Sequence, residues 1–226
     1  MATLLSISAK KEDLQTSSGS SYISKSGIYP VKINFASVEE SKNGATQVNF
    51  NFDYNGNAQA IWGPYITNNR GEANKIGVTL INSLGIIIGL GEGEDLTMEQ
   101  ETFKVGKDNK EKEFLIIPEF TEQEVLVRLQ EEYSSYNGEI RKSMVIKAFY
   151  RASDNASAAE IANNTDKGVQ FEKDQKYVDN VTYIDTTAEE VEAWKKTKAD
   201  AANNASTTKA APKAAVKPVG SVFLKK

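Results

Sequence analysis

The sequence predicts a mainly β protein with a minor α-helical part. Several short runs alternate between apolar and polar side chains, a pattern typical of half-buried strands. Asn-Gly dipeptides at 43–44, 55–56 and 137–138 follow or separate such runs, and this pair favours the tight turns of β-hairpins. Few segments show helical spacing, so we expect strands to dominate the fold.

The first two predicted strands lie on either side of the turn at residues 42–44. Residues 29–35 alternate, and we place all four apolar side chains of this run on one buried face. Residues 47–52 alternate in the same way, with Asn49 and Asn51 opposite the two phenylalanines. The pair therefore has an apolar core face and an outer face that is polar but uncharged.

A third strand and a helix follow. The turn at residues 53–57 leads to a strand predicted over 58–65, where Pro64 marks an end or a bend. Residues 72–84 have apolar positions spaced by four, one and three, which predicts an amphipathic helix with Gly85 as its stop.

The segment 89–112 predicts an inserted hairpin. Phe103 and Val105 are expected to pair with Phe114 and Ile116 across a turn that contains glycine. The lysine run at its tip fits a solubilising loop better than a nucleic-acid patch.

Two more strands are predicted over residues 125–130 and 144–149, joined by the turn at 136–138. A capping-box pattern that begins at Thr121 also allows a helix over 122–133. We prefer the strand, because the Asn-Gly turn needs a strand on each side. A second capping box, Thr187 to Glu190, predicts a helix over 188–202 that packs Trp194 on the body.

Three strands, one helix and two strands is the element order of a five-stranded Greek-key OB barrel. Such barrels bind oligonucleotides or oligosaccharides on the face of strands two and three and on nearby loops. We therefore predict an OB-like domain over 27–198, with specialising insertions at 89–112 and 153–181. A flexible lead-in over 1–26 precedes it, and a disordered Ala/Lys-rich tail over 199–226 follows it.

Composition excludes several classes of enzyme. The 226 residues contain no Cys and no His, which removes thiolate nucleophiles, serine triads, histidine bases and the usual zinc ligands. No pair or triad of acids stands at a meaningful spacing, so a carboxylate-only Mg²⁺ nuclease ranks last. We expect no catalysis, no metal and no cofactor.

Charge is unevenly spread along the chain. The formal net charge is −4, but residues 201–226 carry +5, which leaves −9 on the rest. An acidic body argues against general nucleic-acid binding, although a local basic groove is compatible with it. No run is long and apolar enough for a membrane span, and the start lacks the features of a signal peptide, so we expect a cytoplasmic protein.

Two short segments resemble the OB-fold single-stranded-DNA-binding proteins of bacteriophages. These are Ser26–Ile33 with Gly27, Tyr29 and Val31, and the later stretch from Glu119 through Tyr136-Asn137-Gly138. The resemblance covers residues 27–151 and implies coating of single-stranded DNA during replication or recombination in the host cytoplasm. It implies replication or recombination proteins as partners, with self-association left open. Many such proteins end in an acidic tail, whereas this chain ends in Lys225-Lys226, which puts recruitment through the tail in doubt.

Stacking of bases on aromatic faces and contact of cations with phosphates predict the site. The candidate residues are Lys32, Asn49, Asn51, Tyr54, Trp62, Tyr65, Arg70, Arg128, Tyr133, Tyr136, Arg141 and Lys147, with Arg151 as a further cation. Each has an ordinary structural alternative. Trp62 could be plain core, Tyr133 and Tyr136 could brace a turn, and cations on strands are usually only solvated. The alternative function is a virion, structural or adaptor protein that uses the barrel to hold protein.

Overall fold

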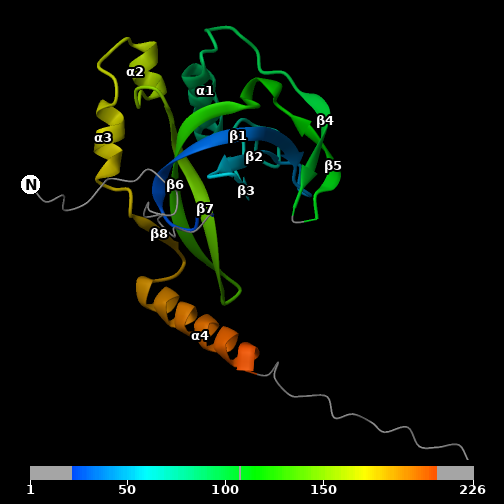
Figure 1. The fold of residues 1–226 in the computed structure, drawn as a ribbon, viewed down its shortest axis with the longest axis vertical. Helices are drawn as coiled ribbons and strands as arrows, with labels where there is room; N and C mark the ends of the chain where they lie inside the picture. The colour runs from blue at the N-terminus through cyan, green and yellow to red at the C-terminus, as the bar shows by residue number, and fades with distance from the viewer. Residues whose placement is uncertain (1–21, 107, 208–226) are drawn as a thin grey trace, which may run out of the picture. The chain divides into compact units, whose positions relative to one another are not determined.

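The computed structural model describes residues 22–106 and 108–207, and it is mainly β, as the sequence predicts (Figure 1). Most of the predicted lead-in and tail therefore lies outside the described residues. The strands are β1 (Gly27–Glu40), β2 (Thr46–Tyr54), β3 (Asn57–Ile61), β4 (Glu99–Val105), β5 (Lys110–Ile116), β6 (Gln123–Tyr136), β7 (Glu139–Arg151) and β8 (Val181–Ile184). The helices are α1 (Lys75–Ile88), η2 (Pro118–Phe120), α2 (Ala158–Ala162), α3 (Val169–Gln175) and α4 (Ala188–Thr207).

The described residues form two compact units. The larger contains the described residues up to Glu132 together with Lys142–Thr182. The smaller contains Tyr133–Arg141 and the described residues from Tyr183 onward, which include α4.

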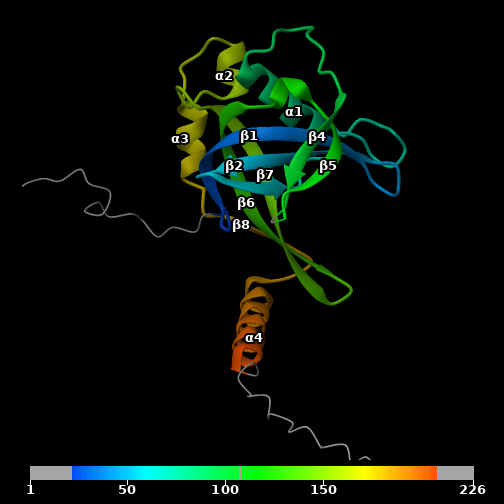
Figure 2. The same cartoon turned by 45° about the vertical axis from the view of Figure 1, so that its right-hand side comes forward.

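The long strand β1 organises the sheet. Its first half pairs with β6, from Gly27 opposite Leu129 to Ile33 opposite Gln123, and its second half pairs with β2. The strand order is β3-β2-β1-β5-β4 (Figure 2). Outside this order, β6 pairs with β1, β7 and β8. The described pairings leave this antiparallel sheet open, and none of them joins β3 to β7. Closure into a barrel therefore stays a prediction.

A β-bulge in β1 corrects the predicted strand faces. Ile33 lies opposite Phe52, but Phe35 lies opposite Asn51, so Asn34 is one extra residue in β1. Ile33 stays in the core, whereas Phe35 turns to the outer face. The prediction that all four apolar residues share one face was wrong, because strict alternation fails at a bulge.

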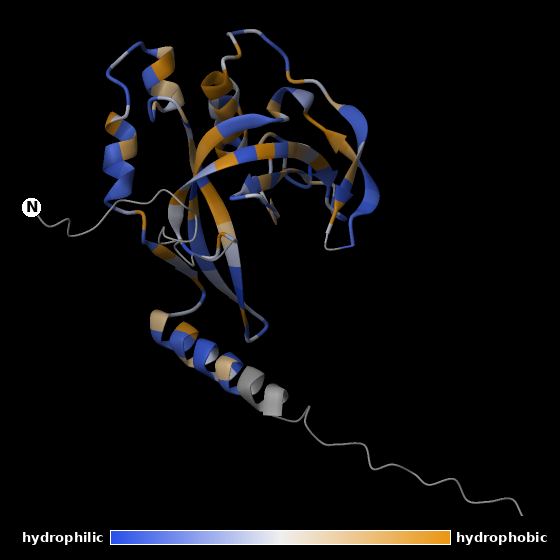
Figure 3. Ribbon diagram, viewed as in Figure 1, coloured by the Kyte–Doolittle hydropathy of each residue, from blue (hydrophilic) through white to orange (hydrophobic). Residues whose placement is uncertain are grey.

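The core fills the inner face of the sheet. Val48, Phe50 and Phe52 of β2 pack there with Ile81 and Leu84 of α1. Apolar and polar residues alternate along β1 and β2 in Figure 3. The predicted apolar face of β2 is therefore confirmed.

Helix α1 is confirmed, with different ends from those predicted. Asn74 caps its start, since the Asn74 side chain accepts a hydrogen bond from the N–H of Ile76. Gly85 lies buried inside the helix, and Gly89, at φ 101°, ends it. Ile76, the first apolar position of the predicted helix, is 83% exposed, because it lies in the first turn, away from the packed face.

The remaining elements are of the predicted type, helix or strand, but some of their pairings and bounds differ from the prediction. Segment 99–116 is a hairpin, but Phe103 lies opposite Lys112 and not opposite an apolar partner. Residues 123–136 are strand and not helix, as preferred. Strand β3 ends at Ile61, so Trp62 to Tyr65 lie beyond it and do not complete the predicted strand. Helix α4 begins after Thr187, whose capping box with Glu190 is present.

Candidate nucleic-acid interface

A groove of about 710 Å³ lies between the outer face of β2 and β3 and the β4–β5 hairpin. The amides of Asn49 and Asn51 line it from β2, and the small residues Ala58 and Ala60 line it from β3. Small side chains and amides leave a flat surface with hydrogen-bonding capacity, on which a planar group can lie.

The bulge at Asn34 creates one wall of this groove. Phe35, turned outward, stacks on Phe103 with ring centroids 4.2 Å apart, and its centroid lies 4.8 Å from that of Phe114. Phe35 is 5% exposed, so the hairpin covers it fully. The hairpin thereby brings Lys104 and Lys112 to the groove.

Two exposed aromatic side chains line the groove with the residues of β3. Trp62 is 68% exposed and Tyr22 is 52% exposed. The chain next to Tyr22 is tied to β3, because the N–H of Ile23 donates to Oε1 of Gln59 and Nε2 of Gln59 donates back to the Ile23 carbonyl, both at 2.8 Å. Solvent-facing rings beside a cationic wall are the parts of a stacking platform.

Gly63 fixes the position of Trp62. A Cβ at Gly63 would lie 1.9 Å from the Val48 carbonyl oxygen, so only glycine allows the chain to cross β2 this closely. The N–H of Val48 donates to the Pro64 carbonyl at 3.0 Å. The N–H of Gly63 donates to Oδ1 of Asn49 at 3.2 Å. That bond sets the amide orientation of Asn49 and leaves its Nδ2 as the donor available to the groove.

The groove is locally cationic although the chain is acidic. Its lining includes Lys104 and Lys112, against the single carboxylate of Glu39. Lys112 lies over the Phe114 ring at 4.6 Å, and Lys104 is 4.0 Å from Glu111 in a pair exposed by about two-thirds on both sides. Exposed contacts of this kind are weak, so a phosphate group can replace them at both ammonium groups.

Three predicted site residues come together in this groove, namely Asn49, Asn51 and Trp62. Tyr65, which is 43% exposed, is not among the residues that line the groove, and it forms an isolated β-bridge with Gln47. Arg70 is exposed in a turn and forms no ion pair with any residue that the structure describes.

Sequence reasoning did not assign Tyr22, Lys104, Lys112 or Phe114 to the groove. Tyr22 was assigned to the lead-in, Lys104 and Phe114 to the inserted hairpin, and Lys112 to its solubilising tip. The useful signal was the aromatic content of the hairpin, since Phe103 and Phe114 both pack on Phe35 of β1 and not only on each other's strand.

Two of the predicted contacts on β6, Arg128 and Tyr133, are covered, which corrects their expected exposure. Arg128 pairs with Asp174 of α3 at 2.8 Å, and both side chains are 16% exposed. Tyr133 is 1% exposed and packs edge-on against Trp194 at 6.1 Å in the smaller unit. Alternation showed that Arg128 leaves the core face, but it could not show that a later segment covers it.

Lys32, Tyr54 and Arg151 are also engaged elsewhere. Lys32 forms an ion pair with Glu122, and hydrogen bonding to that carboxylate raises the pKa of Lys32. Tyr54 packs edge-on against Tyr29 at 5.4 Å, beside the core. Arg151 pairs with Asp154 at 2.6 Å.

The last three predicted residues lie apart from the groove. Tyr136 is 64% exposed at the β6–β7 turn, where the Arg141 guanidinium lies 5.8 Å from its ring. Lys147 of β7 lines a different groove, next to α1 and α3. The residues predicted as one site are therefore divided among several surfaces.

No family model matches this chain, and no curated protein matches it. Within the described residues, no three acidic side chains gather closely enough to hold a metal ion. None of the described helices combines the length and apolar character needed to span a bilayer.

Proposed function

We propose that the protein binds single-stranded DNA in the groove between β2, β3 and the β4–β5 hairpin. Trp62 carries the proposal: an indole held in solvent by Gly63, beside an amide floor and two lysines, is suited to stacking on a base. Aromatic stacking and backbone cations together give binding that tolerates any sequence. The role that follows is coating of single-stranded DNA in phage replication or recombination, in the host cytoplasm and without catalysis.

The order of the elements supports this proposal. When the inserted β4–β5 hairpin and the short η2 are set aside, three strands, one helix and two strands follow one another, with β6 and β7 last. β1 pairs with both β2 and β6, as the first strand of such a barrel does. The groove lies on β2 and β3, the face that OB folds use for oligonucleotides.

Titration with fluorescein-labelled poly(dT) at low and high salt tests the function. Because lysines that contact phosphates release counterions, we expect saturable binding at about 50 mM salt that weakens steeply as salt rises. A folded protein that does not bind poly(dT) at low salt would overturn the proposal.

Two observations favour the alternative of a structural or adaptor protein. The first 200 residues carry a net charge of −9, and the groove floor is formed of uncharged amides. Such a protein would show no affinity for poly(dT) at any salt concentration while remaining folded, so the same titration separates the two functions.

A further inference from the structure

A second groove, of about 1010 Å³, lies between α1, β7 and the α2–α3 segment. Its lining includes every residue of β7 from Val145 to Tyr150. Successive side chains of a strand point to opposite faces, so a groove lined by six consecutive residues runs along the strand's edge. Among the described strands β7 pairs only with β6, which leaves its other edge open.

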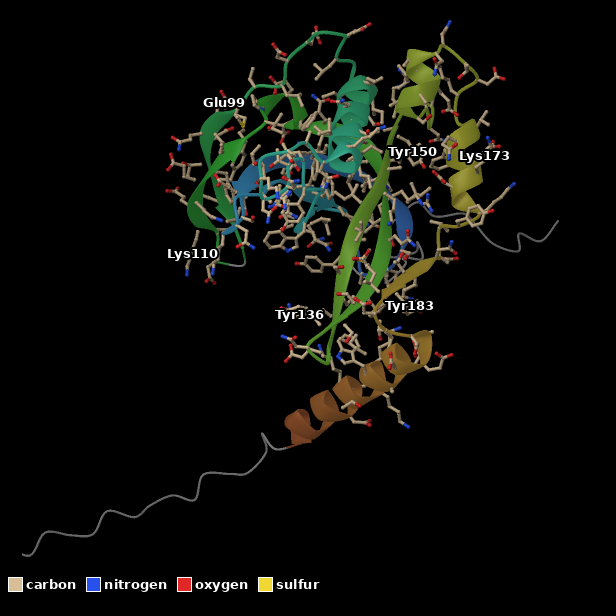
Figure 4. The ribbon with its side chains drawn as sticks, turned by 180° about the vertical axis from the view of Figure 1, so that it is seen from behind. Glu99, Lys110, Tyr136, Tyr150, Lys173 and Tyr183 are labelled. Atoms are coloured by element: carbon tan, nitrogen blue, oxygen red, sulfur yellow. The ribbon has the colours of Figure 1, made fainter. Side chains whose placement is uncertain are left out.

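An open strand edge presents a row of backbone N–H and C=O groups that another extended chain can pair with. The groove leaves this strand edge accessible between α1 on one side and the α2–α3 segment on the other. α1 and α2 adjoin each other (Figure 1), and Lys173 of α3 lies near Tyr150 at the end of β7 in Figure 4. The space between these flanking helices suits a single extended segment better than the edge strand of another sheet.

The lining favours aliphatic side chains over bases. Ile76 is 83% exposed and Val169 is 43% exposed, and Leu80 and Val145 are half-buried beside them. The two rings in the lining, Phe149 and Tyr150, are 2% and 1% exposed and offer no face for stacking. The second groove therefore lacks the element that the first groove has in Trp62.

The charges of the lining favour an acidic segment. Lys75, Lys147 and Lys173 line the groove and form no ion pair within the part of the chain that the structure describes. The acids there are engaged, with the exception of Asp166. Asp174 is paired with Arg128, and Glu160 accepts hydrogen bonds from the backbone N–H groups of Ser157, Gly168 and Gln170.

We propose that the open edge of β7 binds an extended, acidic and aliphatic segment of a partner protein by β-augmentation. Main-chain hydrogen bonds to β7 would hold the segment, the aliphatic lining would take alternate side chains, and the three lysines would pair with its carboxylates. The chain's own residues 201–226 are excluded as the occupant by charge, since they carry five lysines and no acid. This proposal is independent of DNA binding in the first groove.

The test uses a fluorescein-labelled synthetic peptide of about eight residues, the length of an ordinary strand, with alternating Glu and Val. We expect saturable binding to the full-length protein, measured by fluorescence anisotropy. The same peptide with alternate amides N-methylated keeps its side chains but loses ladder donors, so it should not bind. A peptide of alternating Lys and Val should not bind either.

Lysine variants locate the site. We expect the triple variant Lys75→Gln, Lys147→Gln, Lys173→Gln to lower peptide affinity by about tenfold through the loss of exposed charge contacts. The matched variant Lys104→Gln, Lys112→Gln, in the first groove, should leave peptide binding unchanged. Far-ultraviolet circular dichroism confirms that both variants fold.

Three results would overturn the proposal. The first is no binding of the Glu/Val peptide to folded protein, and the second is equal binding of its N-methylated form. The third is a loss of poly(dT) binding in the triple variant without a loss in the matched one, which would assign the second groove to nucleic acid.

Discussion

Phe35 of β1 stacks on Phe103 of β4 with ring centroids 4.2 Å apart, and this contact fastens the hairpin to the outer face of the sheet. We expect Phe103→Ala to loosen the hairpin without unfolding β1 and β2. Since an aromatic pair contributes about 0.5–1.5 kcal/mol beyond its buried area, amide protection in β4 and β5 should fall by roughly tenfold. Hydrogen exchange measures this, and poly(dT) affinity should fall with it. Met98→Ala, at a 61% exposed residue just before β4, should change neither.

The two tryptophans give a direct optical test of the DNA groove. Trp62 lines the groove, whereas Trp194 packs against Tyr133 in the smaller unit. Poly(dT) should quench the emission of Trp194→Phe, which keeps Trp62, and leave the emission of Trp62→Phe unchanged. Trp62→Ala should weaken binding by about 1–3 kcal/mol. Its free energy of unfolding should change by about 0.5 kcal/mol or less, because Trp62 is 68% exposed. The opposite quenching pattern would exclude this groove.

Lys104 and Lys112 should contribute to the salt dependence of DNA binding. Each phosphate contact on a single strand contributes about 0.7 to the slope of log affinity against log salt, so Lys104→Gln with Lys112→Gln should lower the slope by roughly 1.4. The control is Lys75→Gln with Lys110→Gln, which removes equal charge. Lys75 lines the second groove, and Lys110 (Figure 4) lies at the start of β5. Lys110 is paired with Asp108. An equal decrease in both would indicate general electrostatics in place of contact.

The Arg128–Asp174 pair should stabilise the larger unit. Both side chains are 16% exposed, and Asp174 also bonds the hydroxyl of Tyr150. Asp174→Asn leaves a largely buried guanidinium without its counter-charge, so we expect a loss of about 3 kcal/mol in chemical denaturation. Glu139→Gln, which removes the exposed pair with Arg141, should cost about 0.5 kcal/mol or less. Similar losses in both variants would mean that solvent screens the Arg128 pair.

Glu160 should make the α2–α3 connection sensitive to acid. Burial alone raises the pKa of this carboxyl, but bonds from the N–H groups of Ser157, Gln170 and Gly168 outweigh it and hold the pKa below its ordinary value. The resulting stabilisation is complete above about pH 5 and is lost as pH falls through the lowered pKa. The protection factors of the Gly168 and Gln170 amides, measured against the intrinsic exchange rate at each pH, should fall over that range in the native protein. They should show no such step in Glu160→Gln.

Much of the fold could be predicted from local pattern. Alternation placed Val48, Phe50 and Phe52 correctly in the core, and the capping box at Thr187 located the start of α4. These features depend on residues close in sequence. The bounds of α1 were less predictable, because Gly85 lies buried inside the helix and Gly89, in the left-handed conformation, ends it.

The candidate site was harder to predict, because it depends on contacts between distant segments. Trp62 and the two amides are neighbours through β2 and β3, so pattern found them. Lys112 reaches the groove only through the Phe35–Phe103 contact, and Arg128 is covered only because α3 places Asp174 over it. Neither of these long-range contacts can be inferred from the type of a side chain or from the face of the strand on which it lies.

The outward turn of Phe35 limits how the gene for this protein can change. Beyond it, Ala36 and Val38 belong to the core side of β1, while Ser37 and Glu39 line the groove. Loss of the Asn34 codon would only remove the bulge, because Ile33, Phe35 and Ala36 would then alternate regularly against β2. Loss of the Ala36 codon would instead exchange the two sets beyond it and place the Glu39 carboxylate among the phenylalanines. Substitutions in this strand act one side chain at a time, whereas such a deletion acts on all the side chains that follow it. In related chains we therefore expect the strand beyond Phe35 to vary in residue identity while its length stays constant.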